Sequence, residues 1–339
     1  MLMSRHGFLD VCLQSHVAGW AMEDGGPAVL DIFINDERIA QIDCNYPRPE
    51  LAQFNILPSA GFFFHFPSPL SPTDVASVRF RSGEHIENSP SRQHVRHLDQ
   101  MLHGVAGGRG LEFGALDRPM LSRERFDVFF VDHASREDLV KKYQAAHDVS
   151  LVNPERIVHV DFVWPGGALD AVVGGQRFSF ALASGVIEHI GDPIGWLTQI
   201  ASVLEPGGRL NLAIPEPTMT FDHRRRLTSP AEMLDDHLRG LQRPNFRQIF
   251  DHVTGVAPLG APAPDRETRL DNIRRAYGIG QAAERDGQYL DMHCHVWTPQ
   301  SWLECWETIE ALNLAPLRID HMFEPLPETA MFVVSLVRT

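Results

Sequence analysis

Short apolar runs alternate with polar segments through the middle of the chain, and a polar residue closes each run. The runs cover residues 110–113, 126–131, 157–160 and 178–183. Carboxylates mark the first three, at Glu112, Asp132 and Asp161, and Ser184 closes the fourth. This pattern predicts parallel strands joined by helices, as in an α/β fold. Ligands bind such sheets beyond the carboxyl ends of the strands, so we expect these acids to converge on one crevice.

The first 90 residues follow a different pattern. Their short runs are rich in branched and aromatic residues, have no helical period and are separated by Pro or Gly clusters. Asn35-Asp36 stands between two runs as a hairpin turn. These features predict an all-β domain at 1–90, a sandwich or small barrel with Trp20 and the stripe 62–66 in its core. The polar segment 83–100 is expected to be a linker or connecting helix.

Residues 91–339 are expected to form the second domain. Helix signals follow the strands, with N-caps at Ser135, Asp192 and Thr298 and with proline after the last two. A helical insertion at about 230–285 follows a fifth strand at 209–214, where it would cover the cleft as a lid. The predicted closing elements are two antiparallel strands at 317–323 and 331–337.

The spacing of the acids narrows the class of ligand. Asp132 follows Glu112 by 20 residues, the interval at which a nucleotide-binding sheet places a carboxylate for ribose hydroxyls. A dinucleotide also needs Gly-x-Gly-x-x-Gly to cradle its phosphates. Only Gly114 is present here; Leu116 and Asp117 occupy the places where further glycines are needed, and Asp117 would repel a phosphate. We therefore expect a nucleoside without phosphates, a description that S-adenosylmethionine fits.

Five segments together resemble the motifs of class I S-adenosylmethionine-dependent methyltransferases. They are Gly-Leu-Glu-Phe-Gly at 110–114, Phe-Phe-Val-Asp-His at 129–133, Val-His-Val-Asp-Phe at 158–162, Ser-Gly-Val-Ile-Glu-His at 184–189 and Leu-Glu-Pro-Gly-Gly at 204–208. The resemblance covers about 96–339 and is closest to a bacterial group often found among surface-polysaccharide genes. It implies a Rossmann-like sheet of seven mostly parallel strands with an antiparallel last strand, and a small-molecule or glycan acceptor methylated at oxygen.

The resemblance also implies which residues contact the methionine and ribose parts of the cofactor. Glu112 and the Gly114-Ala115 turn would lie by the methionine part, where a side chain at the glycine would block close approach of the backbone. Asp132 would accept hydrogen bonds from both ribose hydroxyls, and His133 would pack beside the adenosine.

For the adenine ring, the resemblance implies contacts at the ends of the third and fourth strands. Asp161 would accept a hydrogen bond from the adenine amino group while Phe162 covers the ring. Ser184 would line the cleft beside them. A helix cap is the alternative interpretation of Asp161, because Asp often occupies that position.

His189 is the first candidate for a catalytic base. It follows Glu188, a carboxylate that could orient its ring towards the acceptor. A purely structural role at the start of a helix is an equal alternative. Asp222-His223, after the fifth strand, is a further candidate near the lid. Because proximity alone supplies much of the rate in such a reaction, an enzyme without a base is also consistent with the sequence.

Asp291, His293 and His295 alternate, so in an extended segment all three would face one side. The alternation is consistent with half of a metal site, with an acid/base pair over the acceptor, or with a polar strand face. Because no further ligand is evident, no metal is expected. We take His293 and His295 as catalytic candidates together with His189.

Composition limits the partners. A net charge of −14 argues against nucleic acid, which requires clustered Lys and Arg. Four cysteines lack metal-type spacing, and neither a membrane span nor a secretion signal is evident, so a cytoplasmic location is expected.

The N-terminal module itself loosely resembles a β-module appended to bacterial glycan enzymes, through the segments 19–21, 48–50 and 61–62. Its expected role is either contact with saccharide or a scaffold that orients the enzyme or joins it in a homodimer. Two alternatives to the enzyme remain at this stage. One is a catalytically silent methyltransferase fold that binds glycans or assembles with a partner, and the other is a nicotinamide-dependent oxidoreductase.

Overall fold

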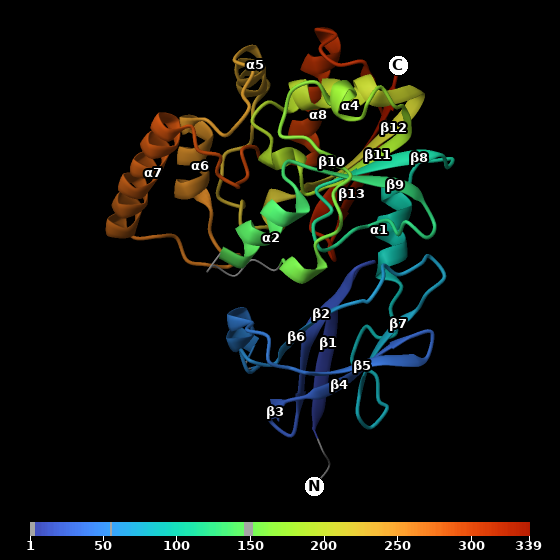
Figure 1. Ribbon diagram of the computed structural model, residues 1–339. Helices are drawn as coiled ribbons and strands as arrows, with labels where there is room; N and C mark the ends of the chain where they lie inside the picture. Colours follow the sequence, from blue (N-terminus) through green and yellow to red (C-terminus); the bar gives the residue numbers. More distant parts are fainter. Residues whose placement is uncertain (1–3, 55, 146–151) are drawn as a thin grey trace. The chain divides into compact units, whose positions relative to one another are not determined.

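The structure is a computed structural model that describes residues 4–54, 56–145 and 152–339. The chain divides into two compact units, one of Met1–Gln100 with Arg118–Ser122 and the other of Met101–Asp117 with Arg123–Thr339. Each unit has its own core and is described by itself. Figure 1 gives the labels of the elements used below.

The N-terminal unit contains two antiparallel sheets that share a core. The strands of the first are β1 (Arg5–Cys12), β2 (His16–Glu23), β3 (Gly26–Pro27) and β6 (Gly61–His65). Those of the second are β4 (Val29–Ile34), β5 (Glu37–Asp43) and β7 (Ala76–Phe80). The unit also contains the 3-10 turn η1 (Pro49–Phe54), and helix α1 (Gln93–Met101) starts within it.

Sequence signals explain much of this unit. The β4–β5 hairpin turns at Asn35 and Asp36, whose φ angles of 51° and 65° are of the left-handed kind that Asn and Asp tolerate. Phe62 and Phe66 lie in the core as expected. Trp20 does not, because it is only half-buried on β2. The expected antiparallel β region is therefore present, with one core residue misassigned.

The second unit is built on a mixed sheet. Among the described residues the sheet has seven strands, in the order β10-β9-β8-β11-β12-β14-β13. Their bounds are β8 (Arg109–Phe113), β9 (Asp127–Asp132), β10 (Phe162–Val163), β11 (Phe178–Ser184), β12 (Leu204–Pro215), β13 (Leu317–Leu326) and β14 (Met331–Arg338). The first five in the order are parallel, and β14 is antiparallel to both of its neighbours. The predicted Rossmann-like sheet with an antiparallel last strand is confirmed.

Helices and 3-10 turns connect these strands. The helices are α2 (Arg136–Ala145), α3 (Leu169–Val172), α4 (Pro193–Val203), α5 (Pro230–Leu238), α6 (Phe246–Gly255), α7 (Arg266–Asp286) and α8 (Pro299–Ala311). The turns are η2 (Pro154–Arg156), η3 (Ile187–His189) and η4 (Pro217–Met219). Asp192 and Thr298 cap α4 and α8 as predicted, each followed by proline. The helix that the Ser135 cap predicts is expected to extend from 135 to 146, and its last residue lies outside the described residues.

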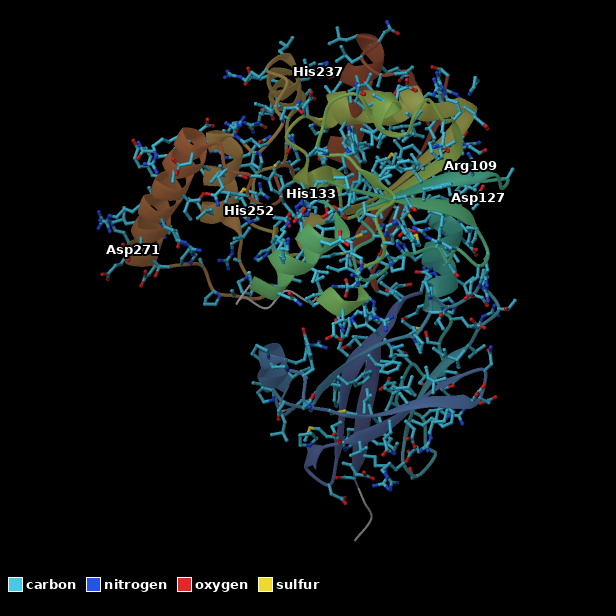
Figure 2. The ribbon with its side chains drawn as sticks, in the orientation of Figure 1. Arg109, Asp127, His133, His237, His252 and Asp271 are labelled. Atoms are coloured by element: carbon cyan, nitrogen blue, oxygen red, sulfur yellow. The ribbon has the colours of Figure 1, made fainter. Side chains whose placement is uncertain are left out.

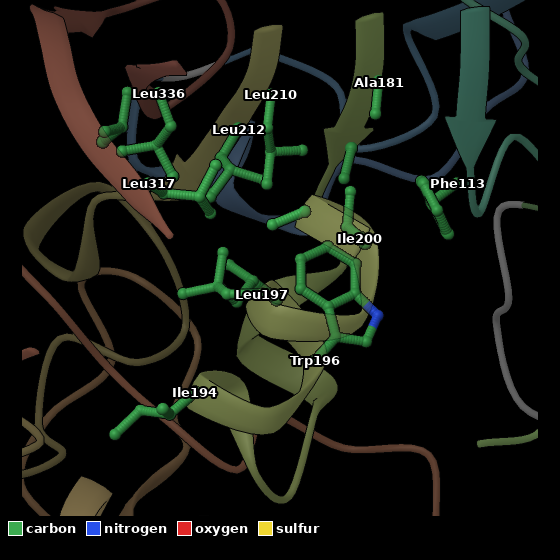
Figure 3. Packing of buried hydrophobic residues seen from close by; sticks show 14 of the residues in the cluster. Phe113, Ala181, Ile194, Trp196, Leu197, Ile200, Leu210, Leu212, Leu317 and Leu336 are labelled. Carbon is green, nitrogen blue, oxygen red and sulfur yellow. The ribbon is translucent and has the colours of Figure 1, made fainter. Parts of the chain in front are cut away.

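The core of this unit lies between the sheet and the helices α4 and α8. Trp196, Leu197 and Ile200 on α4 face Leu210 and Leu212 on β12 (Figure 3). Their spacing of one, three or four residues puts them on one side of the helix, which is why α4 buries that side against the strands. The packing holds the carboxyl ends of the strands in place beside the start of α4.

The register of the sheet shows which residues reach its carboxyl edge. Phe113 of β8 pairs with Val131, and Val163 of β10 pairs with Asp132. Gly114, His133 and Trp164 therefore follow the strands at the same edge. Figure 2 shows His133 at this edge and Arg109 and Asp127 at the opposite ends of β8 and β9.

One strand predicted from the sequence is displaced. The apolar run 157–160 forms no strand; its Ile157 and Val160 pack against Leu139 of α2 in a small cluster of their own. Strand β10 comes later and has only two residues. Within the part of the chain that the structure describes, no helix has the length and apolar character required to cross a bilayer.

Candidate active site

A cavity of about 600 Å³ opens at the carboxyl edge of the sheet. Residues that follow β8, β9, β10 and β11 line it, together with the start of α4 and segments on either side of α6 and α7. From the insertion, Leu241, Gln242 and Arg243 of the α5–α6 loop contribute to the wall. This volume is within the range of pockets that bind small molecules and cofactors.

Asp132, the last residue of β9, lies in the cavity wall as expected. Its side chain is 7% exposed. The backbone N–H of His133 donates to Oδ1 at 2.7 Å, and the His133 ring nitrogen Nδ1 lies at the same distance from that oxygen. The other oxygen, Oδ2, has no hydrogen-bond partner among the described residues. His133 thus orients the Asp132 carboxylate, and Oδ2 remains available to accept a hydrogen bond.

Two glycines at strand ends let the backbone approach the cavity closely. Gly114 has φ +66°, and a Cβ there would come within 2.7 Å of Val186 Cγ2. Gly185 has φ +64°. Both line the cavity, and both adopt a conformation that residues with side chains rarely take.

Asp161 and Phe162 do not lie in the cavity, which corrects their predicted place at the adenine ring. The Asp161 carboxylate accepts hydrogen bonds from the Phe130 backbone N–H at 2.7 Å and from the Arg123 guanidinium at 2.5 Å. Phe162 packs against Phe129 and Phe178. The reason is the register: Asp161 precedes β10, so the residue at the carboxyl edge is Trp164.

Glu112, Ala115 and Ser184 also lie outside the cavity lining. Glu112 is buried within β8, one residue before the strand ends. The Ser184 hydroxyl points to Met331 Sδ at 3.7 Å, and its neighbour Gly185 lines the cavity instead. Of the three acids expected to converge, only Asp132 reaches the cavity.

His189 lies in the wall with Asp291, as part of a chain of polar groups. Its Nδ1 lies 3.0 Å from Asp291 Oδ1, and Lys142 Nζ lies 2.8 Å from Asp291 Oδ2. Burial alone would lower the pKa of His189, but the Asp291 carboxylate beside its Nδ1 and the charge of Glu188 give a net rise. Burial would raise the pKa of Asp291, yet His189 and Lys142 hold it well below its usual range.

His293 lies directly beside His189. The two rings meet edge to face with centroids 4.7 Å apart. His293 Nδ1 lies 2.5 Å from Asp222 Oδ2, and Asp222 also accepts from Arg225 at 2.9 Å. Burial would raise the pKa of Asp222, but His293 and Arg225 lower it. The predicted pair His189 and His293 is therefore brought together, and Asp222 from a separate sequence candidate joins it.

His295 is placed elsewhere, which corrects its prediction as a catalytic residue. It is 1% exposed and stacks on Trp297, and its Nε2 lies 3.3 Å from Gln248 Nε2. Burial lowers its pKa to about 3. The segment after α7 bends at Met292 and is not a strand, so strict alternation of sides does not hold there.

Several residues of the cavity wall were not singled out from the sequence, among them Tyr143, Trp164, Arg243 and Tyr289. Trp164 is 7% exposed, and its indole N–H donates to the Gly167 carbonyl at 3.1 Å. The Tyr143 hydroxyl donates to Asp291 at 3.4 Å. None of these four had a local signal: Trp164 lies beyond the predicted strand 157–160, and the others come from helices and loops distant in sequence.

Comparison with protein families decides the class to which this site belongs. A family model described as a methyltransferase domain matches residues 84–254, just over half of the chain. The chain belongs to this methyltransferase family. With the sheet described above, it is a class I S-adenosylmethionine-dependent methyltransferase, and S-adenosylmethionine is its cofactor. The silent fold and the oxidoreductase are thereby set aside.

Solved structures with a similar course of the chain include other methyltransferases. The CcbJ methyltransferase from Streptomyces caelestis is 16% identical, with 72% of this chain and 88% of that chain covered and a TM-score of 0.36. A methyltransferase from Mesorhizobium loti is 14% identical, with 72% and 97% covered and a TM-score of 0.34. The glycopeptide N-methyltransferase MtfA, complexed with sinefungin, is 13% identical, with 72% and 93% covered and a TM-score of 0.34. No curated protein matched the methyltransferase.

Proposed function

We propose that this methyltransferase transfers a methyl group to an oxygen atom of a small-molecule or glycan acceptor bound in the cavity. One observation carries the proposal: Asp132 and the His189–Asp291 pair line the same cavity. Asp132 can bind the nucleoside of the cofactor, and the His189–Asp291 pair can bind a polar acceptor. The sugar-binding part rests on the resemblance to polysaccharide-associated enzymes and on the mixture of aromatic and charged groups in the wall.

On the cofactor side, the residues present fit an adenosyl group. The available Oδ2 of Asp132 can accept a hydrogen bond from a ribose hydroxyl. Gly114 and Gly185 leave room for the cofactor against the backbone, because a side chain at either would occupy that space. Trp164, in place of Phe162, supplies an aromatic ring at the end of β10. His133 holds the Asp132 carboxylate in position.

On the acceptor side, S-adenosylmethionine supplies a methyl group on a positively charged sulfur, and a hydroxyl acceptor must lose its proton. The polar groups available are His189, with Asp291 behind it, and His293 beside it. Tyr143 and Tyr289 flank this wall. These residues would orient the acceptor, and alignment of the reacting atoms provides a large part of the rate.

Calorimetry with S-adenosylhomocysteine tests the cofactor side. Asp132→Asn should weaken binding by roughly tenfold or more, because a hydrogen bond to a charged group contributes about 1.5–3 kcal/mol. The matched control is Asp127→Asn, at the opposite end of the same strand and exposed. Equal affinities of the two variants would contradict the role of Asp132.

Mass spectrometry of saccharide products tests the acceptor side. The enzyme is incubated with S-adenosylmethionine and a panel of oligosaccharides, alongside amino sugars of the same size. Methylation at a hydroxyl is expected. Transfer only to amino groups would refute methylation at oxygen. Reaction of small hydroxylated molecules but of none of the saccharides would refute a glycan acceptor.

A further inference from the structure

Glu188, His189 and His293 form a cluster of metal-ligand type beside the cavity. One oxygen or ring nitrogen from each lies within 4.8 Å of the others. Glu188 and His189 belong to η3, and His293 belongs to the segment after α7. His189 lines the cavity, and Glu188 Oε1 lies 3.5 Å from where a Cβ on Gly185 would stand. The cluster therefore borders the space proposed for the acceptor.

Glu188 has an unsatisfied atom in this cluster. Its side chain is 2% exposed, and among residues 4–54, 56–145 and 152–339 its Oε2 has no hydrogen-bond partner. The described residues also provide no ion pair to it. A buried carboxylate oxygen without a hydrogen bond is costly, because that oxygen has lost its hydration. A cation bound at this oxygen would remove that cost.

One of the two imidazoles is already held as metal-bound histidines usually are. Nδ1 of His293 is hydrogen-bonded to Asp222, whereas Nδ1 of His189 lies 3.0 Å from Asp291 Oδ1 without the alignment of a hydrogen bond. An aspartate at Nδ1 favours the tautomer with a proton there, which leaves the lone pair on Nε2. Histidines that bind metals almost always donate their other ring N–H to a carboxylate or carbonyl in this way.

We propose that Glu188, His189 and His293 bind a divalent transition-metal ion, with Zn²⁺ the best suited. Two imidazoles and a carboxylate form the ligand set of some catalytic zinc sites, which keep a further position for water or substrate. Mg²⁺ suits the site less, since it prefers oxygen ligands. Ligand bonds are about 2 Å long, so binding draws the three donors closer together. Of the alternating residues in the sequence only His293 belongs to this site, and Glu188 and His189 supply the other ligands.

The catalytic use of the ion rests on the function proposed above, whereas the site itself does not. A Lewis acid here lowers the pKa of an acceptor hydroxyl, whose proton then passes to water. The oxygen lone pair forms the new bond to the methyl carbon as the carbon–sulfur bond breaks, and that electron pair stays on sulfur. Charge is balanced without any oxidant or reductant.

Metal analysis of the full-length protein tests the site. The protein is stripped with a chelator, loaded with Zn²⁺ and dialysed; about one retained equivalent is expected for the wild type. Glu188→Gln and His293→Asn should each lower Zn²⁺ affinity at least tenfold, and Asp222→Asn about 10- to 100-fold through loss of the carboxylate behind the imidazole. Co²⁺ in the same site should give visible absorption bands that these variants lose.

The matched control is His223→Asn, the same substitution at a histidine outside the cluster, and its Zn²⁺ affinity should equal that of the wild type. Binding of S-adenosylhomocysteine to every variant checks that the fold is retained and reports separately on the cofactor site. A wild type that binds this nucleoside but retains no Zn²⁺ would overturn the metal proposal and leave the proposed function standing. Equal Zn²⁺ affinity in wild type, Glu188→Gln and His293→Asn would overturn it as well.

Discussion

The two units differ in the partners of their histidines: two buried histidines of the N-terminal unit have no carboxylate beside them, whereas four histidines of the methyltransferase unit do. In the N-terminal unit His16 stacks on Phe63 with centroids 4.7 Å apart, and burial, aided by the charges of Arg118 and His65, lowers its pKa to about 3. His97 is 3% exposed, and burial lowers its pKa to about 4. The described residues place no carboxylate in an ion pair with either ring. Both histidines are therefore neutral packing elements.

In the methyltransferase unit, each of four histidines has an aspartate beside its Nδ1. The pairs are His133–Asp132, His189–Asp291, His237–Asp192 and His293–Asp222. Three of these aspartates line the cavity. A carboxylate at one ring nitrogen fixes the orientation of the ring and keeps the other nitrogen directed and polar. The presence of a carboxylate partner therefore distinguishes a histidine that is a candidate for function from one that only packs, and it does so better than burial.

Of the four histidine–aspartate pairs named above, His293–Asp222 is the most buried, and removing its aspartate should have the largest effect on stability. Asp222→Ala leaves Arg225 buried with one partner fewer and His293 with none at Nδ1. Breaking a buried pair costs about 3–5 kcal/mol. We expect about 3 kcal/mol in urea unfolding, since Asp251 still pairs with Arg225. Asp235→Ala, which breaks an exposed pair with Arg239, should cost under about 1 kcal/mol. Equal losses of unfolding free energy in Asp222→Ala and Asp235→Ala would mean that burial does not determine how much an ion pair contributes to stability.

The neutral histidines of the N-terminal unit should make the protein sensitive to acid. The pKa of His97 is lower in the folded state than its ordinary value near 6.5, so below that pH the unfolded state binds more protons. Its contribution to stability is present above pH 6.5 and is lost as the pH falls towards 4. Between pH 7 and pH 5 this loss amounts to about 2 kcal/mol.

His97→Met removes the titrating group and should flatten the pH dependence of the unfolding free energy by that amount. His6→Met, at an exposed position on β1, is the control and should leave the dependence unchanged. An unaltered slope in His97→Met would show that this ring does not resist protonation in the folded state.

The sequence contained enough to predict the fold and two residues of the cavity wall. The break at Gly114 and the acid at Asp132 are local features of strand ends, and both residues line the cavity, whereas Glu112 does not. The order of apolar runs likewise predicts the sheet, because the central strands β8, β9 and β11 are mostly buried on both faces.

Other site residues depend on register and on distant segments, which local patterns do not encode. The run 157–160 looks like a strand because Ile157 and Val160 are buried, but they are buried under α2. That error moved the expected adenine contact to Asp161, whereas the sheet edge falls at Trp164. The alternation of Asp291, His293 and His295 fails for His295 because the segment after α7 is irregular and not a strand, which no residue pattern indicates.

The smallest effect on stability is expected for the pair of Asp192 and His237, because Asp192 both caps α4 and contacts this histidine. Asp192 caps α4 by accepting the Gly195 N–H at 2.9 Å, and both its oxygens lie 3.1 Å from His237 Nδ1. The His237 side chain is 30% exposed, so His237→Gln should cost only about 0.5 kcal/mol. Asp192→Ala removes the cap as well and should cost about 1–2 kcal/mol. A double-mutant cycle measured by urea unfolding isolates the pair, and a coupling energy above about 1 kcal/mol would place His237 with the buried, functional pairs despite its exposure.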